Sequence, residues 1–199
     1  MSRNSALIIV DVQNDFCPGG ALPVTNGDTV VPVLNRYITL FEAAGLPVFA
    51  TRDWHPEKTR HFKKFGGRWP EHCIQGSAGA AFHKDLNLPL NTAVVTKGDR
   101  PDEEGYSGFQ GRTDSGRPLS LALKDSGIEH IYVAGLATDY CVKETVLDGL
   151  GEGFKVTVLE DAVLGVDMEP GDSKRAIEEM VERGAEAATF EKIQALMAD

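Results

Sequence analysis

The sequence alternates short apolar, β-branched runs with segments of helical periodicity, and this alternation limits the fold more than any other feature. Runs such as ALIIVDV at residues 6–12 are apolar at almost every position, which is typical of strands buried on both faces. Such strands are parallel and have helices packed on either side. The pattern therefore predicts a three-layer α/β/α fold with a mostly parallel six-stranded sheet. Strands are expected at residues 6–12, 46–51, 92–96, 128–134, 155–159 and 186–189, and helices at 28–44, 118–124, 139–150, 172–183 and from 191.

Length and composition favour a single globular domain of ordinary composition. The 199 residues suit one domain, and 42% hydrophobic with 25% charged residues exclude a disordered or collagen-like chain. No apolar run approaches the ~18 residues of a membrane-spanning helix. The start of the chain, Met1 to Asn4, shows no secretory signal, so we expect a cytoplasmic protein without a membrane partner.

The net charge and the cysteine count indicate which binding partners and which covalent links to expect. A net charge of −10 argues against binding of nucleic acid, which needs a positive surface. An odd and sparse set of cysteines indicates free thiols, not a disulfide framework. The three are Cys17, Cys73 and Cys141.

One long stretch departs from the alternation. Residues 53–90 show little periodicity and are rich in Gly, Pro and His. Long irregular loops inside compact domains are usually functional. We interpret this stretch as an irregular insertion over the sheet edge, within the same domain.

Chemically reactive residues follow four of the expected strands. Asp11 ends the first, Asp53-Trp54-His55 follows the second, and Lys97 ends the third. The fourth runs through Gly135 to Cys141, at the start of a helix. Parallel α/β sheets bind ligands outside the carboxyl ends of their strands, so together these groups predict a site at one edge.

Cys141 is the candidate nucleophile. A thiol in the first turn of a helix, near a lysine, is favoured as thiolate, and an aspartate could take its proton. Lys97 and Asp11 are the candidates for these roles, and the amides of Ala137 and Cys141 could form an oxyanion hole. Taken singly, each residue has a plainer interpretation: a buried small cysteine, a loop-starting aspartate and a surface lysine.

A second group of residues suits a divalent metal. Asp53 and His55 lie two residues apart, so they share one side of an extended segment, and His61 and His72 follow in the same insertion. Imidazoles with one carboxylate suit a metal that keeps a position open for a ligand. The alternative is that these histidines are ordinary loop residues. Cys73 is not included, and two further histidines are interpreted as structural: His83 and His130.

At this level of detail the chain resembles the nicotinamidases, or pyrazinamidases, of the isochorismatase-like cysteine hydrolases. The resemblance extends from about residue 7 to residue 190. Motifs general to the superfamily are DVQNDF at 11–16 and ATDYCV at 137–142. The pair DWHP at 53–56 and RWPEHC at 68–73 points to the metal-containing branch, and KG at 97–98, YSGF at 106–109 and GLATDYCV at 135–142 also match.

Position by position, the resemblance implies roles for particular residues. It implies a catalytic triad, metal ligands and residues that line a ring pocket. It also implies a cis peptide bond just before Ala137. His61 stands where relatives have either a further histidine ligand or a serine near metal-bound water, so both roles stay open for it. The implied triad is Asp11, Lys97 and Cys141, the ligands are Asp53, His55 and His72, and the pocket residues are Phe16, Trp69, Tyr106 and Ala137.

The resemblance further implies an isochorismatase-like hydrolase domain over 1–199 that converts nicotinamide to nicotinate and ammonia through a cysteine thioester. One divalent ion, expected to be zinc with iron or manganese as alternatives, would bind the pyridine nitrogen. Pyrazinamide would also be a substrate, and the reaction would serve pyridine nucleotide biosynthesis through NAD salvage. The sequence leaves open whether the chain forms a homo-oligomer.

Three other functions remain to be weighed. An amide hydrolase of the same superfamily could act on a carbamoyl or ureido substrate, but it would need no pyridine-binding metal. Vinyl ether hydrolysis of the isochorismatase type does not require Cys141. A metal-binding or redox-sensing protein without catalysis would not need Asp11 or Lys97.

Overall fold

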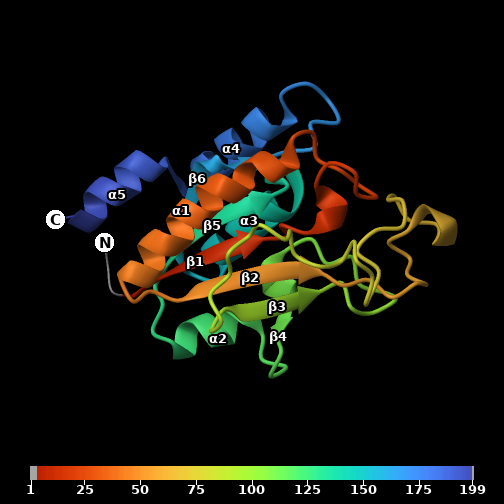
Figure 1. Cartoon of the computed structure of the whole chain (residues 1–199), viewed down its shortest axis with the longest axis horizontal. Coiled ribbons are helices and arrows are strands. Elements are labelled where there is room, and N and C mark those ends of the chain that lie inside the picture. The colour runs from red at the N-terminus through yellow and green to blue at the C-terminus, as the bar shows by residue number, and fades with distance from the viewer. Residues whose placement is uncertain (1–3, 199) are drawn as a thin grey trace.

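Seven strands form one sheet in residues 4–198, the part of the chain that the computed structural model describes (Figure 1). Their spatial order is β4-β3-β2-β1-β5-β6-β7, and all neighbouring pairs are parallel except β3 with β4. The start of the chain at residues 1–3, and residue 199, lie outside the described part. The strands are β1 (Ser5–Val10), β2 (Val48–Asp53), β3 (Ala93–Lys97), β4 (Arg112–Thr113), β5 (His130–Leu136), β6 (Lys155–Leu164) and β7 (Glu186–Ala188).

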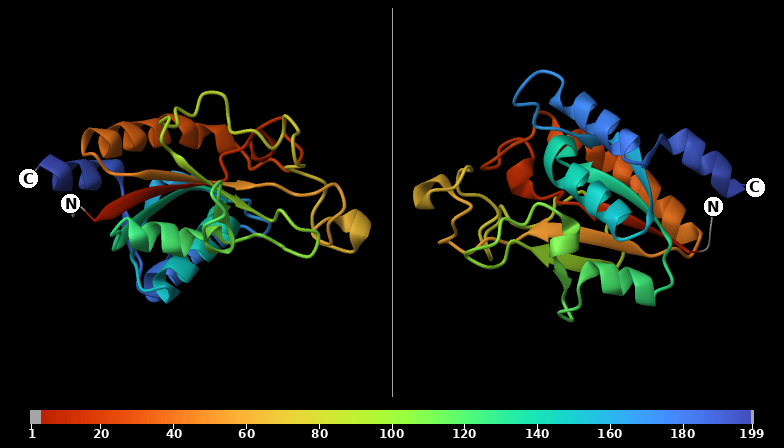
Figure 2. Two further views of the ribbon diagram at one scale, coloured as in Figure 1. Left: turned by 90° about the horizontal axis from the view of Figure 1, so that it is seen from below. Right: turned by 180° about the vertical axis from the view of Figure 1, so that it is seen from behind.

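Helices cover both faces of this sheet and give three layers. Figure 2 shows α1 and α5 on one face and the other three α-helices on the opposite face. The central strand β1 is buried at every position, as its apolar sequence requires. The helices are α1 (Val30–Ala43), α2 (Leu119–Asp125), α3 (Lys143–Gly151), α4 (Asp172–Glu182) and α5 (Phe190–Ala198).

The α/β/α architecture and the six parallel strands are confirmed, and two details differ from expectation. The short antiparallel strand β4 adds a seventh strand. Strand β6 continues to Leu164, because its polar Asp161 has partners: the carboxylate accepts hydrogen bonds from the Tyr37 hydroxyl at 2.8 Å and the Phe190 N–H at 2.9 Å.

The first helix also begins later than the sequence indicates. Asp28 was expected to cap it, but residues Gly27–Thr29 form a 3₁₀ turn, and α1 starts at Val30 without a side-chain cap. Main-chain hydrogen bonds stabilise this start, among them one from Thr29 N–H to the Asn26 carbonyl.

The carboxyl ends of β1, β2, β3 and β5 meet at one end of the molecule, and α5 lies toward the opposite end (Figure 1). The irregular stretch between β2 and β3 begins at that same end, where it contains one short 3₁₀ helix, η3 (Lys63–Phe65). Its later part returns past α1, where Asn35 bonds Asp85 and Asn87, to the start of β3. Among the described residues, no helix has the length and apolar character needed to span a membrane.

Close contact between β1 and β5 depends on Gly135. This residue has a φ of +117°, and a Cβ atom added to it would lie 2.2 Å from the Val10 carbonyl oxygen. A side chain would therefore separate the two strands just before the point where their carboxyl ends enter the site.

We expect Gly135→Ala to destabilise the protein much more than Gly153→Ala. Gly153 also has a positive φ, +89°, but nothing lies within 4 Å of the Cβ that alanine would add, so its substitution measures backbone strain alone, about 1 kcal/mol. The clash at Gly135 should add at least ~2 kcal/mol to the loss in the free energy of unfolding. Urea unfolding of both variants measures this difference, and equal losses would contradict the proposed strand contact.

Candidate active site

The ends of four strands bring acidic, basic and thiol groups together. Asp11 directly follows β1, Asp53 ends β2 and Lys97 ends β3. The register of β2 and β3 pairs Asp53 with Lys97 as direct neighbours. Cys141 lies on η5, a π-helical turn (Thr138–Val142) that follows β5 and leads into α3. The structure thus brings together the four residues that the sequence placed at one edge.

Lys97 is the centre of this cluster and is 1% exposed. Its Nζ lies 2.7 Å from Asp11 Oδ2 and forms a second ion pair with Asp53 Oδ1. The same Nζ donates a hydrogen bond to the Gly105 carbonyl at 2.6 Å and lies 3.6 Å from Cys141 Sγ. A single buried ammonium therefore contacts both carboxylates and the thiol.

The two aspartates have different acidities. Burial raises the pKa of Asp11, and its ion pair with Lys97 offsets only part of this effect. Burial also acts on Asp53, but Lys97 and the neighbouring imidazoles hold the pKa of Asp53 well below its usual range. When the pKa values of two neighbouring carboxylates differ in this way, the one with the lower pKa stays ionised and the other can exchange protons.

Cys141 is 8% exposed, so its thiol lies almost entirely out of water. Burial raises the pKa of Cys141 well above its usual value, and Lys97 lowers it only in part. The sequence favoured a thiolate from the helix start and the lysine; Lys97 acts in that direction, and burial opposes it. The Sγ atom and carboxylate oxygens of Asp11 and Asp53 lie within 4.8 Å of one another, so a proton acceptor is close. The peptide bond between Leu136 and Ala137 is cis, as expected.

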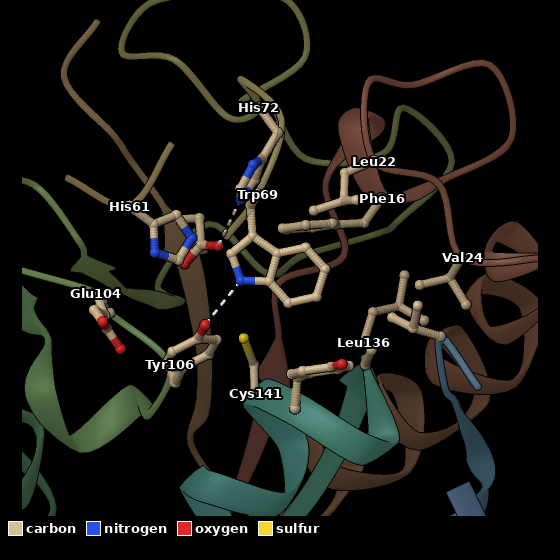
Figure 3. Close-up of a pocket in the computed structure, with 15 residues that line it drawn as sticks. Phe16, Leu22, Val24, His61, Trp69, His72, Glu104, Tyr106, Leu136 and Cys141 are labelled. Carbon is tan, nitrogen blue, oxygen red and sulfur yellow. Dashed lines mark hydrogen bonds and ion pairs between the residues drawn. The ribbon is translucent and has the colours of Figure 1, made fainter. Parts of the chain in front are cut away.

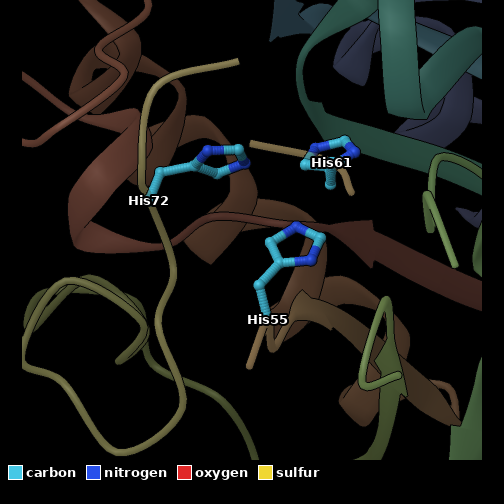
Figure 4. A group of neighbouring side chains, drawn as sticks. All are labelled: His55, His61 and His72. Atoms are coloured by element: carbon cyan, nitrogen blue, oxygen red, sulfur yellow. The ribbon is translucent and has the colours of Figure 1, made fainter. Parts of the chain in front are cut away.

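Three histidines from the irregular stretch converge beside Asp53 (Figure 4). One ring nitrogen of each lies within 4.8 Å of the others. The rings of His55 and His61 are stacked, with centroids 4.5 Å apart, and all three side chains are buried. Asp53 Oδ2 lies 3.5 Å from His55 Nε2 and 3.8 Å from His72 Nε2.

The hydrogen bonds of this group leave nitrogen lone pairs free for a ligand. His55 Nδ1 lies 3.0 Å from the Gly98 carbonyl and His72 Nδ1 lies 2.8 Å from the Pro70 carbonyl. A carbonyl only accepts, so the tautomer that fits these contacts carries its proton on Nδ1 and offers the Nε2 lone pair to a metal ion. Buried His55 Nε2 has no hydrogen-bond partner among the described residues, so it suits a metal ion as its partner.

His61 fits the same set. Burial and the neighbouring imidazoles of His55 and His72 lower the pKa of His61 to about 3, so its ring is neutral. Neutral imidazoles and a carboxylate gathered this closely suit one divalent ion with bonds of ~2.1 Å. The residues present therefore fit the metal that the resemblance implies, without selecting zinc over iron or manganese.

A pocket joins the thiol to the histidines (Figure 3). Cys141 lies at its floor, and Trp69 Nε1 donates a hydrogen bond to the Tyr106 hydroxyl at 2.8 Å across it. All four residues expected to contact a ring line this pocket: Phe16, Trp69, Tyr106 and Ala137. Asp53, His61 and His72 line it as well, whereas His55 lies behind them.

Several residues of the site could not be identified from their sequence positions. The Thr51 hydroxyl donates to Asp11 Oδ1 at 2.6 Å, and the Arg68 guanidinium donates to the Tyr140 hydroxyl at 3.1 Å beside the pocket. A strand threonine and a loop arginine carry no sequence signal for these roles. Apolar side chains from two loops complete the wall: Leu22, Val24 and Val166.

Comparison with known proteins places this geometry in a family. Residues 5–192 match the family described as the isochorismatase domain. The nicotinamidase of Escherichia coli is 42% identical and aligns over 93% of this chain and 94% of its own length. The nicotinamidase/pyrazinamidase of Mycobacterium tuberculosis is 40% identical over 88% of this chain and 93% of its own.

A solved structure shows the same fold. The crystal structure of the pyrazinamidase of Pyrococcus horikoshii in complex with zinc has a TM-score of 0.87 and 46% sequence identity to this chain. The match covers 94% of this chain and 99% of the other.

The histidine cluster predicts that the purified protein holds about one divalent ion per chain. We expect His55→Ala and His72→Ala to retain less than a tenth of it, because each removes a nitrogen donor from the buried set. His83→Ala is the matched control, since His83 lies outside the cluster. Elemental analysis of the four proteins measures the ion, and an unchanged content after either cluster substitution would show that the metal binds elsewhere.

Proposed function

The chain belongs to the isochorismatase family, and we propose that within it this protein is a nicotinamidase, which hydrolyses nicotinamide to nicotinate and ammonia. The observation that carries this proposal is a pocket in which the Cys141 thiol, backed by a buried lysine and two aspartates, faces a cluster of three histidines. The first group suits acyl transfer, and the second suits a ligand with a ring nitrogen.

The histidine side of the pocket binds and orients the substrate. A divalent ion held by Asp53, His55, His61 and His72 would act as a Lewis acid that binds the pyridine nitrogen. The aromatic side chains of Phe16, Trp69 and Tyr106 cover the ring. Together they orient the carboxamide toward Cys141.

The thiol side carries out acyl transfer. Cys141 Sγ attacks the amide carbon while its proton passes to Asp11, whose raised pKa suits it to accept and return protons. The amides of Ala137 and Cys141 donate to the developing oxyanion. Asp11 then protonates the nitrogen, the C–N bond breaks, ammonia leaves and a thioester remains.

Water completes the cycle. Asp11 takes a proton from a water molecule, and the oxygen of that water attacks the thioester carbon. The C–S bond breaks, and Asp11 returns the proton to Cys141 Sγ, which restores both residues. The product leaves as nicotinic acid and loses its proton to solvent to give nicotinate. The Lys97 ammonium stays between Asp11 and the thiol sulfur throughout, so it balances negative charge on either. Pyrazinamide places a ring nitrogen in the same relation to its amide and is a second substrate. Nicotinate production of this kind would feed NAD salvage.

We expect Cys141→Ala to lower the rate of ammonia release from nicotinamide at least ~1,000-fold, because no other thiol of the described residues lines the pocket. The ion content and the unfolding temperature should stay those of the parent. Cys17→Ala serves as the control, since Cys17 is a buried thiol outside the pocket. A Cys141→Ala rate within tenfold of the parent would remove this residue from the mechanism.

A series of four amides tests the role of the ring nitrogen. Nicotinamide and pyrazinamide both carry a nitrogen meta to the amide-bearing carbon, whereas benzamide has none and isonicotinamide has it one position further on. The aromatic walls accept all four rings, but only the first two offer the nitrogen where the histidine side can bind it. We expect kcat/KM to be at least ~100-fold lower for benzamide and isonicotinamide. Comparable values for benzamide and nicotinamide would instead indicate a general aromatic amidase.

A further inference from the structure

Gln13 is fully buried beside the site, and the reaction described above gives it no chemical role. Its Oε1 accepts a hydrogen bond from the Asp53 N–H at 2.8 Å, and its Nε2 donates to the Asp53 carbonyl at 2.8 Å. The second Nε2 hydrogen bond, also 2.8 Å, goes to the Ala80 carbonyl. The amide thus uses its oxygen and both of its N–H groups, and two of the three bonds go to one residue.

The Gln13 amide continues the sheet where strand β1 has ended. The last main-chain bond from this segment to β2 runs from Asp11 N–H to the Thr51 carbonyl at 3.2 Å. The chain turns at Asp11, whose φ is +49°. At the next position of β2, the Gln13 side chain supplies the donor and the acceptor that a neighbouring strand would otherwise present to Asp53.

The other side of the same β2 segment is held by β3, because Trp54 N–H donates to the Lys97 carbonyl at 3.1 Å. The main chain at Asp53 is therefore fixed from both sides. This matters because the two oxygens of its carboxylate serve different groups. Oδ1 pairs with Lys97, and Oδ2 faces the Nε2 atoms of His55 and His72.

We propose that Gln13 is a positioning residue that holds Asp53 where one carboxylate serves the catalytic lysine and the metal-binding histidines at once. The inference rests on the proposed role of Asp53 as a metal ligand. Removing the Gln13 amide leaves the Asp53 N–H and carbonyl and the Ala80 carbonyl without their buried partner. Asp53 then has no fixed position, and both of its contacts weaken.

The test compares zinc affinity in Gln13→Met with the parent protein. Methionine keeps the length of the side chain and removes all three hydrogen bonds. We expect the zinc dissociation constant, measured by competition with a chromogenic chelator on metal-free protein, to rise at least tenfold, as for other residues that orient metal ligands. At saturating zinc, KM for nicotinamide should rise and kcat should fall, because Asp53 contacts both halves of the site. If Gln13→Met does not fold, Gln13→Asn, which keeps the amide on a shorter side chain, is measured in its place with the same expected result.

Asn14→Ala is the matched control. The Asn14 side chain donates to the Ala78 carbonyl at 2.8 Å, so it also connects this segment to the 78–81 loop, but it makes no hydrogen bond to Asp53. We expect its zinc affinity, KM and kcat to remain within threefold of the parent. A purely structural role for Gln13 predicts that both variants lose unfolding temperature alone, with zinc affinity per folded chain unchanged, and this result would overturn the proposal.

A double-mutant cycle tests whether Gln13 acts through Asp53. In an Asp53→Ala background, Gln13→Met should change zinc affinity less than threefold, since the carboxylate that Gln13 positions is gone. An undiminished tenfold effect would mean that Gln13 acts through another part of the site, and would also overturn the proposal. The measurements of zinc affinity are independent of catalysis. A protein with no amide hydrolysis but with the expected zinc results would refute the proposed function and leave the role of Gln13 intact.

Discussion

The buried Lys97 ammonium is the interaction on which the rest of the site depends. It is 1% exposed and lies between two carboxylates, so its burial is tolerable only while both ion pairs are made. Breaking a buried pair by removing one partner typically costs roughly 3–5 kcal/mol, because the remaining charge is left uncompensated. The position of Lys97 Nζ therefore depends on three parts of the fold at once. These are the register of β2 and β3, the turn after β1 and the loop that carries Gly105.

This arrangement also determines the charge available for chemistry. One ammonium between two ionised aspartates leaves one negative charge in excess. Lys97 and the histidines keep the pKa of Asp53 low, whereas burial raises the pKa of Asp11. Burial raises the pKa of the thiol beside them, and Lys97 lowers it in part. The thiol also lies close to a carboxylate that can accept its proton.

The parallel strands and the residues at their ends could be predicted from the sequence, because continuous apolar runs and the strand-end rule are local signals. The positions of the loops could not. Val166 lines the pocket because its N–H donates to Asp139 Oδ1 at 2.9 Å, a contact between segments 27 residues apart. The two residues of β4 are too few to show periodicity. Likewise, histidine spacing suggested a metal site, but its convergence depends on bonds such as that from Cys73 N–H to Asp15 Oδ2 at 2.7 Å, which no pattern reveals.

The placement of Lys97 has a consequence for how this protein acquires its chemistry during folding. Lys97 lies 44 residues from both Asp53 and Cys141 along the chain, and each of these residues follows or ends a different strand. No hairpin, single βα unit or fragment contains the cluster, so bringing it together requires the closure of several long loops. Contacts of such high sequence separation form late and together with the sheet. The nucleophile, its proton acceptor and the ligand-binding histidines should thus appear in one cooperative event. A partly folded chain would carry a cysteine without the carboxylate, the ammonium and the histidines that surround it in the native site.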